Sequence, residues 1–156
     1  MKGLERLARL LYPPKCVLCG RLLEKEETDL CHGCRVDAPD CPVSRTKLSF
    51  LDSWTAVWFY EDNVRRSLIR YKFRNARSYA GCYGRLLAMK LQREHPGEFE
   101  LITWVPISPL RKFFRGYDQV QLLAEAVAGE LGMESVPLLK KIRHNRPQSS
   151  ISGEAQ

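Results

Sequence analysis

The stretch CVLCGRLLEKEETDLCHGC, which runs from Cys16 to Cys34, decides how the N-terminal part of this chain folds. It contains two Cys-x-x-Cys pairs that are separated by eleven residues. Two residues between thiolates allow one tight turn to direct both sulfurs at a single ion, and two such turns make a closed tetrahedral site. Soft thiolates in that geometry favour Zn²⁺ over harder cations. The spacing therefore predicts a structural Zn²⁺ bound by Cys16, Cys19, Cys31 and Cys34.

Two other kinds of site stay open for these cysteines, namely a redox or disulfide pair and an iron–sulfur cluster. A redox Cys-x-x-Cys normally opens a helix in a βαβ unit, and these pairs do not. A closed set of four thiolates leaves no open position for water, so the ribbon is not expected to be catalytic. His32 is expected to point away from the ion, Cys41 to be a bystander or the relic of a second knuckle, and Cys82 to be a small core residue.

Length and composition exclude several classes of protein. The chain has 156 residues, 44% of them hydrophobic and 28% charged, which is typical of a folded domain and not of a disordered chain. No apolar run approaches the ~20 residues that span a bilayer. Glu5, Arg6 and Arg9 interrupt any signal peptide, so we expect a cytoplasmic location. The net charge of +7 is spread along the chain and weakly favours anionic partners.

The chain divides into two parts by composition. A leucine stripe over residues 3–12 predicts a short helix that Pro13 ends. Residues 15–42 hold too few apolar side chains to fold without a staple. We therefore expect an N-terminal helix and zinc ribbon over 1–42, a linker over 43–52 and a second domain over 53–156. Loss of one zinc ligand is expected to unfold the ribbon and to leave much of the second domain intact.

Strand-like and helix-like segments alternate in the second domain. Short aromatic, β-branched or apolar runs predict strands, and apolar residues at i, i+4 and i+7 predict helices. The predicted strands are Trp54–Tyr60 and Leu101–Ile107, and the predicted helices are a segment capped by Asp62 or Asn63, residues 79–94 and residues 119–131. A basic loop is expected from Ser108 to Asp118. The alternation predicts an α/β fold with a parallel sheet.

That basic loop follows the C-terminal end of a predicted strand, where ligands bind in open α/β sheets. Arg111, Lys112 and Arg115 precede Gly116 and the next helix, an arrangement that suits a phosphate or pyrophosphate group. The alternative is a solvated loop in which Asp118 is a simple N-cap.

A second basic stretch covers residues 65–77 and has aromatic side chains among its cations. Such a mixture can bind single-stranded nucleic acid through stacking and charge neutralisation. The alternative is an ordinary amphipathic helix whose arginines stay in water. The candidate nucleic-acid-binding residues are Arg65, Arg66, Arg70, Lys72 and Arg74.

Several motifs in order resemble the ComF family, which are competence-associated proteins with a zinc ribbon and a phosphoribosyltransferase-like domain. Residues 11–20, which read LYPPKCVLCG, and the second cysteine pair resemble the ribbon. Tyr71-Lys72-Phe73 resembles the family's Lys-Phe motif. Residues 105–124 resemble its V-P-x-P … R-x-R-G-[FY]-N-Q-x-x-x-L-A segment, except that Ser108 delays the second proline and Asp118 replaces an asparagine. Residues 138–141 and Gln148 resemble the next segment of the family.

The resemblance implies a type I phosphoribosyltransferase-like parallel-sheet domain over 53–156, and it implies that this domain is incomplete. In the family an acidic pair and a Thr-Thr-Gly-like loop bind phosphoribosyl pyrophosphate beyond the Gln148 region, and the sequence ends at Gln156 without them. We therefore expect a truncated chain with no catalytic residues, in which Arg111, Arg115 and Gly116 form the pyrophosphate side. Phosphoribosyl pyrophosphate and Mg²⁺ are expected only in an intact member.

The resemblance also implies a role in DNA uptake, with single-stranded DNA and competence-machinery proteins as partners. Two alternatives stay open. One is an active phosphoribosyltransferase that uses phosphoribosyl pyrophosphate, and the other is a zinc-ribbon adaptor that binds single-stranded DNA.

Overall fold

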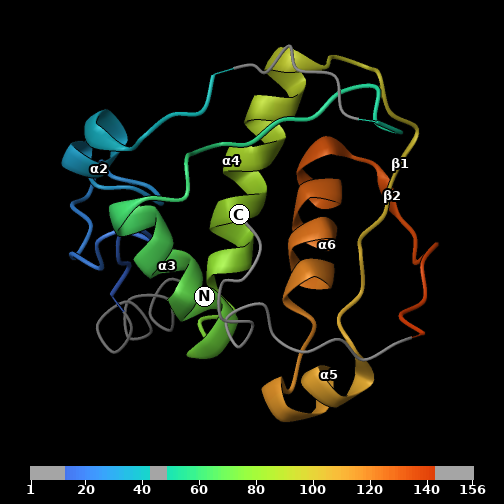
Figure 1. Ribbon diagram of the computed structural model, residues 1–156. Coiled ribbons are helices and arrows are strands. Elements are labelled where there is room, and N and C mark those ends of the chain that lie inside the picture. The colour runs from blue at the N-terminus through green and yellow to red at the C-terminus, as the bar shows by residue number, and fades with distance from the viewer. Residues whose placement is uncertain (1–12, 43–48, 143–156) are drawn as a thin grey trace, which may run out of the picture.

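The computed structural model describes residues 13–42 and 49–142 of the chain (Figure 1). The helix expected over 3–12, most of the expected linker and the tail around Gln148 lie outside the described residues. The elements are α2 (His32–Asp37), α3 (Asp62–Phe73), α4 (Tyr79–Glu94), β1 (Leu101–Ile102), α5 (Pro109–Arg115), α6 (Gln119–Leu131) and β2 (Glu134–Ser135). None of the described helices combines the length and the hydrophobicity needed to cross a bilayer.

The two long helices α4 and α6 have the bounds that the sequence predicts. Asp118 caps α6, because its carboxylate accepts hydrogen bonds from the Val120 and Gln121 N–H groups. Gly132 ends α6 in the left-handed conformation, with φ of 64°. Helix α3 also forms, but its N-cap is Glu61 rather than Asp62 or Asn63, and the Glu61 side chain makes no capping hydrogen bond.

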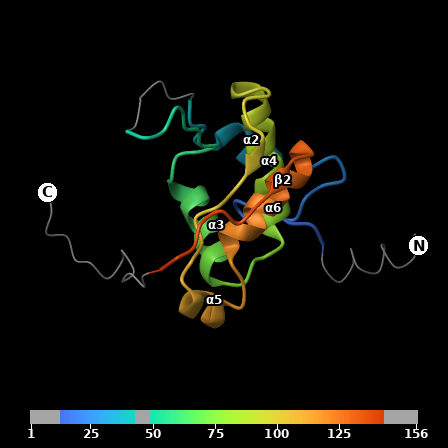
Figure 2. The ribbon, with the colours of Figure 1, turned by 90° about the vertical axis from the view of Figure 1, so that its right-hand side faces the viewer.

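Helices and sheet are arranged in layers, with α6 between α4 and the strands (Figures 1 and 2). The parallel pair β1–β2 places Leu101 opposite Glu134 and Ile102 opposite Ser135. Helices α4 and α6 approach closely at Gly84, where a Cβ atom would lie 2.6 Å from the Cβ atom of Ala126. The fold is therefore mixed α/β with a small parallel sheet.

Three sequence predictions about strands and loops need correction. Trp54–Tyr60 forms only an isolated bridge, Trp58 with Asp40, because no longer strand of the described chain lies beside it. The predicted strand Leu101–Ile107 is regular only over β1, since its partner β2 has two residues. The expected basic loop contains helix α5, which Ser108 caps and Pro109 begins, and Gly116 ends it at a φ of 72°.

One hydrophobic core joins the ribbon to α3 and α4. The ribbon contributes Cys16, Val17 and Leu18, which are at most 2% exposed, and they pack with Val64, Tyr71, Cys82 and Tyr83. The Ser67 hydroxyl of α3 donates a hydrogen bond to the Val17 carbonyl oxygen. The sequence alone suggests that zinc binding affects the folding of the ribbon only. Because the core is shared, we now expect zinc binding to affect the folding of α3 and α4 as well.

Candidate metal centre

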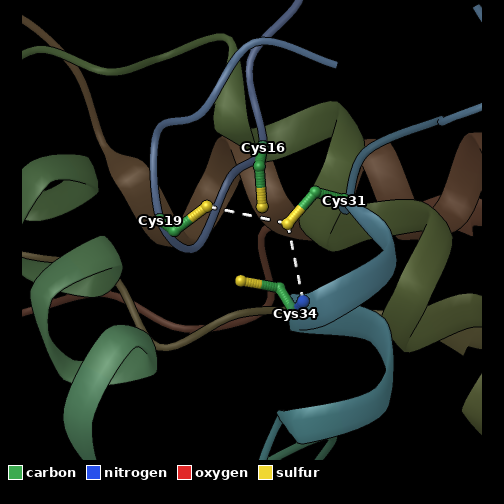
Figure 3. Close-up of side chains that lie close together, drawn as sticks. All are labelled: Cys16, Cys19, Cys31 and Cys34. Atoms are coloured by element: carbon green, nitrogen blue, oxygen red, sulfur yellow. Dashed lines mark hydrogen bonds between the residues drawn. The ribbon is translucent and has the colours of Figure 1, made fainter. Parts of the chain in front are cut away.

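Two short turns bring the four predicted cysteines together (Figure 3). In the first turn the Gly20 N–H donates to the Cys16 carbonyl oxygen over 2.9 Å, and Gly20 adopts a φ of 80° that favours glycine. In the second turn Cys31 is the N-cap of α2 and Cys34 lies in its first turn. All four sulfur atoms lie within 4.8 Å of one another.

The distances between sulfur atoms fit a tetrahedral metal site better than disulfides. A Zn–S bond of about 2.3 Å places neighbouring sulfurs of a tetrahedron about 3.8 Å apart. The Cys19 and Cys31 sulfurs are 3.7 Å apart, whereas a disulfide would require about 2.05 Å. None of the six cysteines is joined to another in a disulfide. These four cysteines could therefore hold a metal ion such as Zn²⁺.

The start of α2 favours the thiolate form of Cys31. The Cys34 N–H points to the Cys31 sulfur over 3.5 Å and lowers the pKa of the Cys31 thiol to about 7. Burial raises the pKa of Cys34 and Cys19. Since the thiolate is the form that binds metal, Cys31 is the most readily deprotonated of these three ligands. The positive charge of a bound metal ion would stabilise the thiolate form of the other cysteines and so favour their deprotonation.

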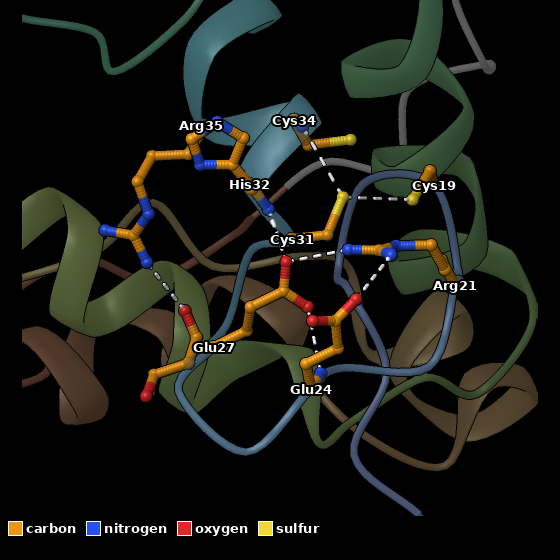
Figure 4. A network of polar contacts seen from close by, with 9 residues as sticks. Cys19, Arg21, Glu24, Glu27, Cys31, His32, Cys34 and Arg35 are labelled. Carbon is orange, nitrogen blue, oxygen red and sulfur yellow. Dashed lines mark hydrogen bonds and ion pairs between the residues drawn. The ribbon is translucent and has the colours of Figure 1, made fainter.

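Glu27 holds the loop between the two turns (Figure 4). Its carboxylate accepts hydrogen bonds from the His32 N–H at 2.6 Å, the Arg21 guanidinium at 2.7 Å and the Glu24 N–H at 2.9 Å. The Glu24 and His32 N–H groups lower the pKa of Glu27. His32 thus supports the site with its backbone, and its ring is not among the clustered ligand atoms. Nothing in the sequence distinguishes Glu27 from the acidic residues beside it.

Polar contacts fix the ribbon on the helices. Asp29 accepts two hydrogen bonds from Arg85 of α4, at 2.8 and 2.5 Å, and Arg85 lowers the pKa of Asp29. The Arg70 guanidinium donates to the carbonyl oxygens of Val17 and Leu18 at 3.1 and 2.6 Å. The charge of Arg70 is therefore directed at the first turn of the metal centre.

The other four candidate nucleic-acid-binding residues are exposed. Arg65, Arg66, Lys72 and Arg74 all have exposed side chains, and Arg66 donates to the Asn63 side chain over 3.0 Å. The structure therefore places Arg70 apart from the neighbours with which the sequence groups it.

The two basic segments meet where α3 ends. The Arg115 guanidinium lies 4.7 Å from the centre of the Phe73 ring, and Arg77 lies 4.6 Å from the Tyr117 ring. Burial and the nearby Arg111 lower the pKa of Arg115. Helix α5 and the end of α3 therefore form one surface.

The backbone around the candidate pyrophosphate site already has partners. The Gly116 N–H donates to the Lys112 carbonyl oxygen over 2.8 Å. Asp118 occupies the N–H groups at the start of α6, and its second oxygen accepts from the Ile107 N–H over 3.2 Å. An anion at this helix end would therefore have to compete with the carboxylate of Asp118.

We expect the substitution Asp118→Ala to destabilise the protein by about 2–4 kcal/mol, because it removes a helix cap and leaves the Ile107 N–H without its acceptor. The substitution Asp118→Asn keeps one acceptor oxygen and should cost about half as much. Urea denaturation followed by circular dichroism measures both. Equal stability of the alanine variant and the parent would contradict the capping role.

Comparison with known proteins confirms the ComF resemblance, although no family model and no solved structure matches the chain. The chain is 28% identical over 115 residues to competence protein ComFC of Bacillus subtilis (strain 168). This alignment covers 72% of the present chain and 44% of the Bacillus subtilis protein. It is 28% identical over 167 aligned residues to competence protein ComFC of Streptococcus pneumoniae (strain ATCC BAA-255 / R6), covering 87% and 72% respectively. The chain is ComF-like, and its match spans less than half the length of the first relative.

Proposed function

We propose that this ComF-like protein acts in DNA uptake and binds single-stranded DNA along the outer face of α3. The names of the two relatives link them to competence. The observation that carries the DNA contact is the sorting of cations on α3, since Arg70 faces the ribbon while its four basic neighbours are exposed. From Asn63 to Arg93 the sequence has no acidic residue that would repel phosphates.

The spacing of these side chains suits an extended strand. Arg65 and Lys72 lie seven residues apart on one face of the helix, and Arg66 has the same relation to Phe73. The Phe73 side chain is 65% exposed. Cations can therefore contact phosphates while an aromatic ring stacks with a base, the combination that single-strand binders use.

The test compares two charge-matched variants. We expect the substitution of Arg65, Arg66, Lys72 and Arg74 by alanine to weaken single-stranded DNA binding by about 10-fold or more, and to make the slope of log K against log salt shallower by about 3. Arg70 is left in place because it holds the ribbon. Fluorescence anisotropy of a labelled oligonucleotide measures both quantities.

The control variant removes the same number of charges elsewhere. Its substitutions to alanine are at Lys15, Lys25, Arg93 and Lys140, which are exposed and lie outside α3. DNA binding should change much less in this variant. Equal weakening in both variants would show that only the net charge matters and would overturn the proposed α3 site.

In the same proposal Zn²⁺ is the structural ion and the protein is located in the cytoplasm. Residues 1–42 form the N-terminal helix and zinc ribbon, residues 43–52 form a linker, and residues 53–156 form a phosphoribosyltransferase-like domain. The parallel pair β1–β2, with α5 and α6 between its strands, supports that domain type. Arg111 and Arg115 would supply the cations for a pyrophosphate group. The Gly116 N–H, which Lys112 already engages, would not contribute.

A further inference from the structure

The sheet β1–β2 has one covered face and one open face. Side chains alternate along β1 and the residues that follow it, because Leu101, Thr103 and Val105 are exposed. Ile102 and Trp104 are half-buried on the opposite face, where α6 packs (Figures 1 and 2). Parallel sheets occur almost only where both faces are covered. The open side, which we call the outer sheet face, is therefore a candidate docking surface.

The centre of the outer sheet face is apolar. Leu101, Val105 and Leu138 are 41%, 66% and 59% exposed. The register that pairs Leu101 with Glu134, continued by four residues, places Val105 opposite Leu138. The sequence has no charged residue from 101 to 110 or from 135 to 139. The centre of the face thus has the composition of a protein–protein interface core.

The two ends of the outer sheet face carry opposite charges. Glu100 precedes β1 directly and Glu134 begins β2, whereas Lys140 and Lys141 follow the C-terminal end of β2. Because the two strands are parallel, both glutamates lie at one end of the face and both lysines at the other.

This charge pattern distinguishes between possible partners. A nucleic acid would be repelled by the acidic end and would gain little from the aliphatic side chains in the centre. A second copy whose strands run antiparallel to those of the first would bring lysines against glutamates at both ends of the contact. Such an interface is isologous, because the same patch serves both copies.

We propose that two copies of this chain associate through their outer sheet faces about a two-fold axis. Leu101, Val105 and Leu138 of each copy form the centre of the interface, and the lysines of each copy face the glutamates of the other. Sheets that pack face to face in this way lie about 10 Å apart. The proposal does not depend on DNA binding by α3, which lies on the far side of α4 from the sheet (Figure 1).

Sedimentation velocity of the zinc-loaded full chain over a range of concentrations tests the proposal. We expect a dimer, and we expect the substitution Val105→Asp to raise its dissociation constant by about 10-fold or more. The reason is that a symmetric interface would bury the unpaired carboxylate twice.

The matched control is Val36→Asp in α2, which makes the same chemical change at 68% exposure, against 66% for Val105. The control should dimerise like the parent, and both variants should keep the circular dichroism spectrum and zinc content of the parent. A parent that is monomeric at every concentration, or equal dimerisation of the two aspartate variants, would overturn the proposal.

Charge reversal tests the orientation of the two copies and leaves the apolar centre intact. One variant combines Glu100→Lys with Glu134→Lys and has lysines at both ends. The other combines Lys140→Glu with Lys141→Glu and has glutamates at both ends. Each variant alone should dimerise about 10-fold or more weakly than the parent, and an equimolar mixture should recover dimers, because opposite charges again face each other. Added salt should reduce both effects. Dimerisation of each variant alone at the parent strength, or a mixture no stronger than its components, would overturn the proposal.

Discussion

Replacement of Cys31 by serine is expected to abolish the binding of one Zn²⁺ per chain and to unfold α3 and α4 together with the ribbon. The four sulfur atoms lie within 4.8 Å of one another, so loss of one ligand opens the whole set. Structural zinc sites contribute about 10–16 kcal/mol in small zinc-binding peptides, while whole domains are stable by only about 5–15 kcal/mol. The loss is therefore comparable to the whole stability of a typical domain.

The effect extends beyond the ribbon because its first turn is part of the shared core. Cys16, Val17 and Leu18 are almost completely buried against α3 and α4. Their departure would expose Val64 and Tyr71 to water. It would also remove the acceptors of Ser67, Arg70 and Arg85, since all three donate to ribbon residues. These groups would then bond to water, so each lost hydrogen bond costs only its net contribution, about 0.5–1.5 kcal/mol for the hydroxyl and about 1.5–3 kcal/mol for the charged groups.

Elemental analysis of the protein purified under reducing conditions measures the zinc, and hydrogen exchange measures protection of α3 and α4. The control is Cys41→Ser, which changes a buried cysteine outside the cluster and should keep one Zn²⁺ per chain. Full protection of α3 and α4 in the zinc-free protein would mean that the ribbon folds independently, as the spacing alone suggests. A zinc content near zero in the parent would contradict the metal site itself.

The accuracy of the sequence predictions depended on whether a signal was local. Helices α4 and α6 have the predicted bounds because their signals lie within the helices and directly beside them, such as the cap Asp118 and the stop Gly132. Strands need a partner elsewhere in the chain, so the apolar run Trp54–Tyr60 could not reveal that it has only one bridge, to Asp40. Helix α5 was not predicted because it buries none of its residues, so no apolar periodicity follows the start signal Ser108-Pro109.

The candidate metal ligands were predictable and their supporting residues were not. Cysteine spacing is a direct consequence of how two turns surround an ion. The ion pair of Asp29 with Arg85 joins residues that are 56 positions apart, and no pattern in the sequence relates them. Arg70 shares its residue type with exposed neighbours, so only the packing of α3 on the ribbon shows that it contacts Val17 and Leu18.

The close approach of α4 and α6 gives the second large effect, because we expect the substitution Gly84→Ala to destabilise the protein. The new Cβ atom would lie 2.6 Å from the Ala126 Cβ atom and 3.0 Å from the Ala126 backbone carbon. A backbone atom cannot move aside as a flexible side chain can, so the two helices must separate. Overpacking of this kind costs about 1–3 kcal/mol, which outweighs the gain of about 1 kcal/mol that alanine brings to a helix interior.

The matched control is Gly129→Ala in α6, where the added Cβ atom meets nothing within 4 Å. Helix propensity then acts alone, and stability should rise by up to about 1 kcal/mol. The same chemical change should therefore have opposite signs at two helical glycines, which urea denaturation resolves. Adding Ala126→Gly to the Gly84→Ala variant should restore part of the loss, because it removes the nearest of the clashing atoms. If both alanine variants were stabilised alike, α4 and α6 could not pack against each other at Gly84.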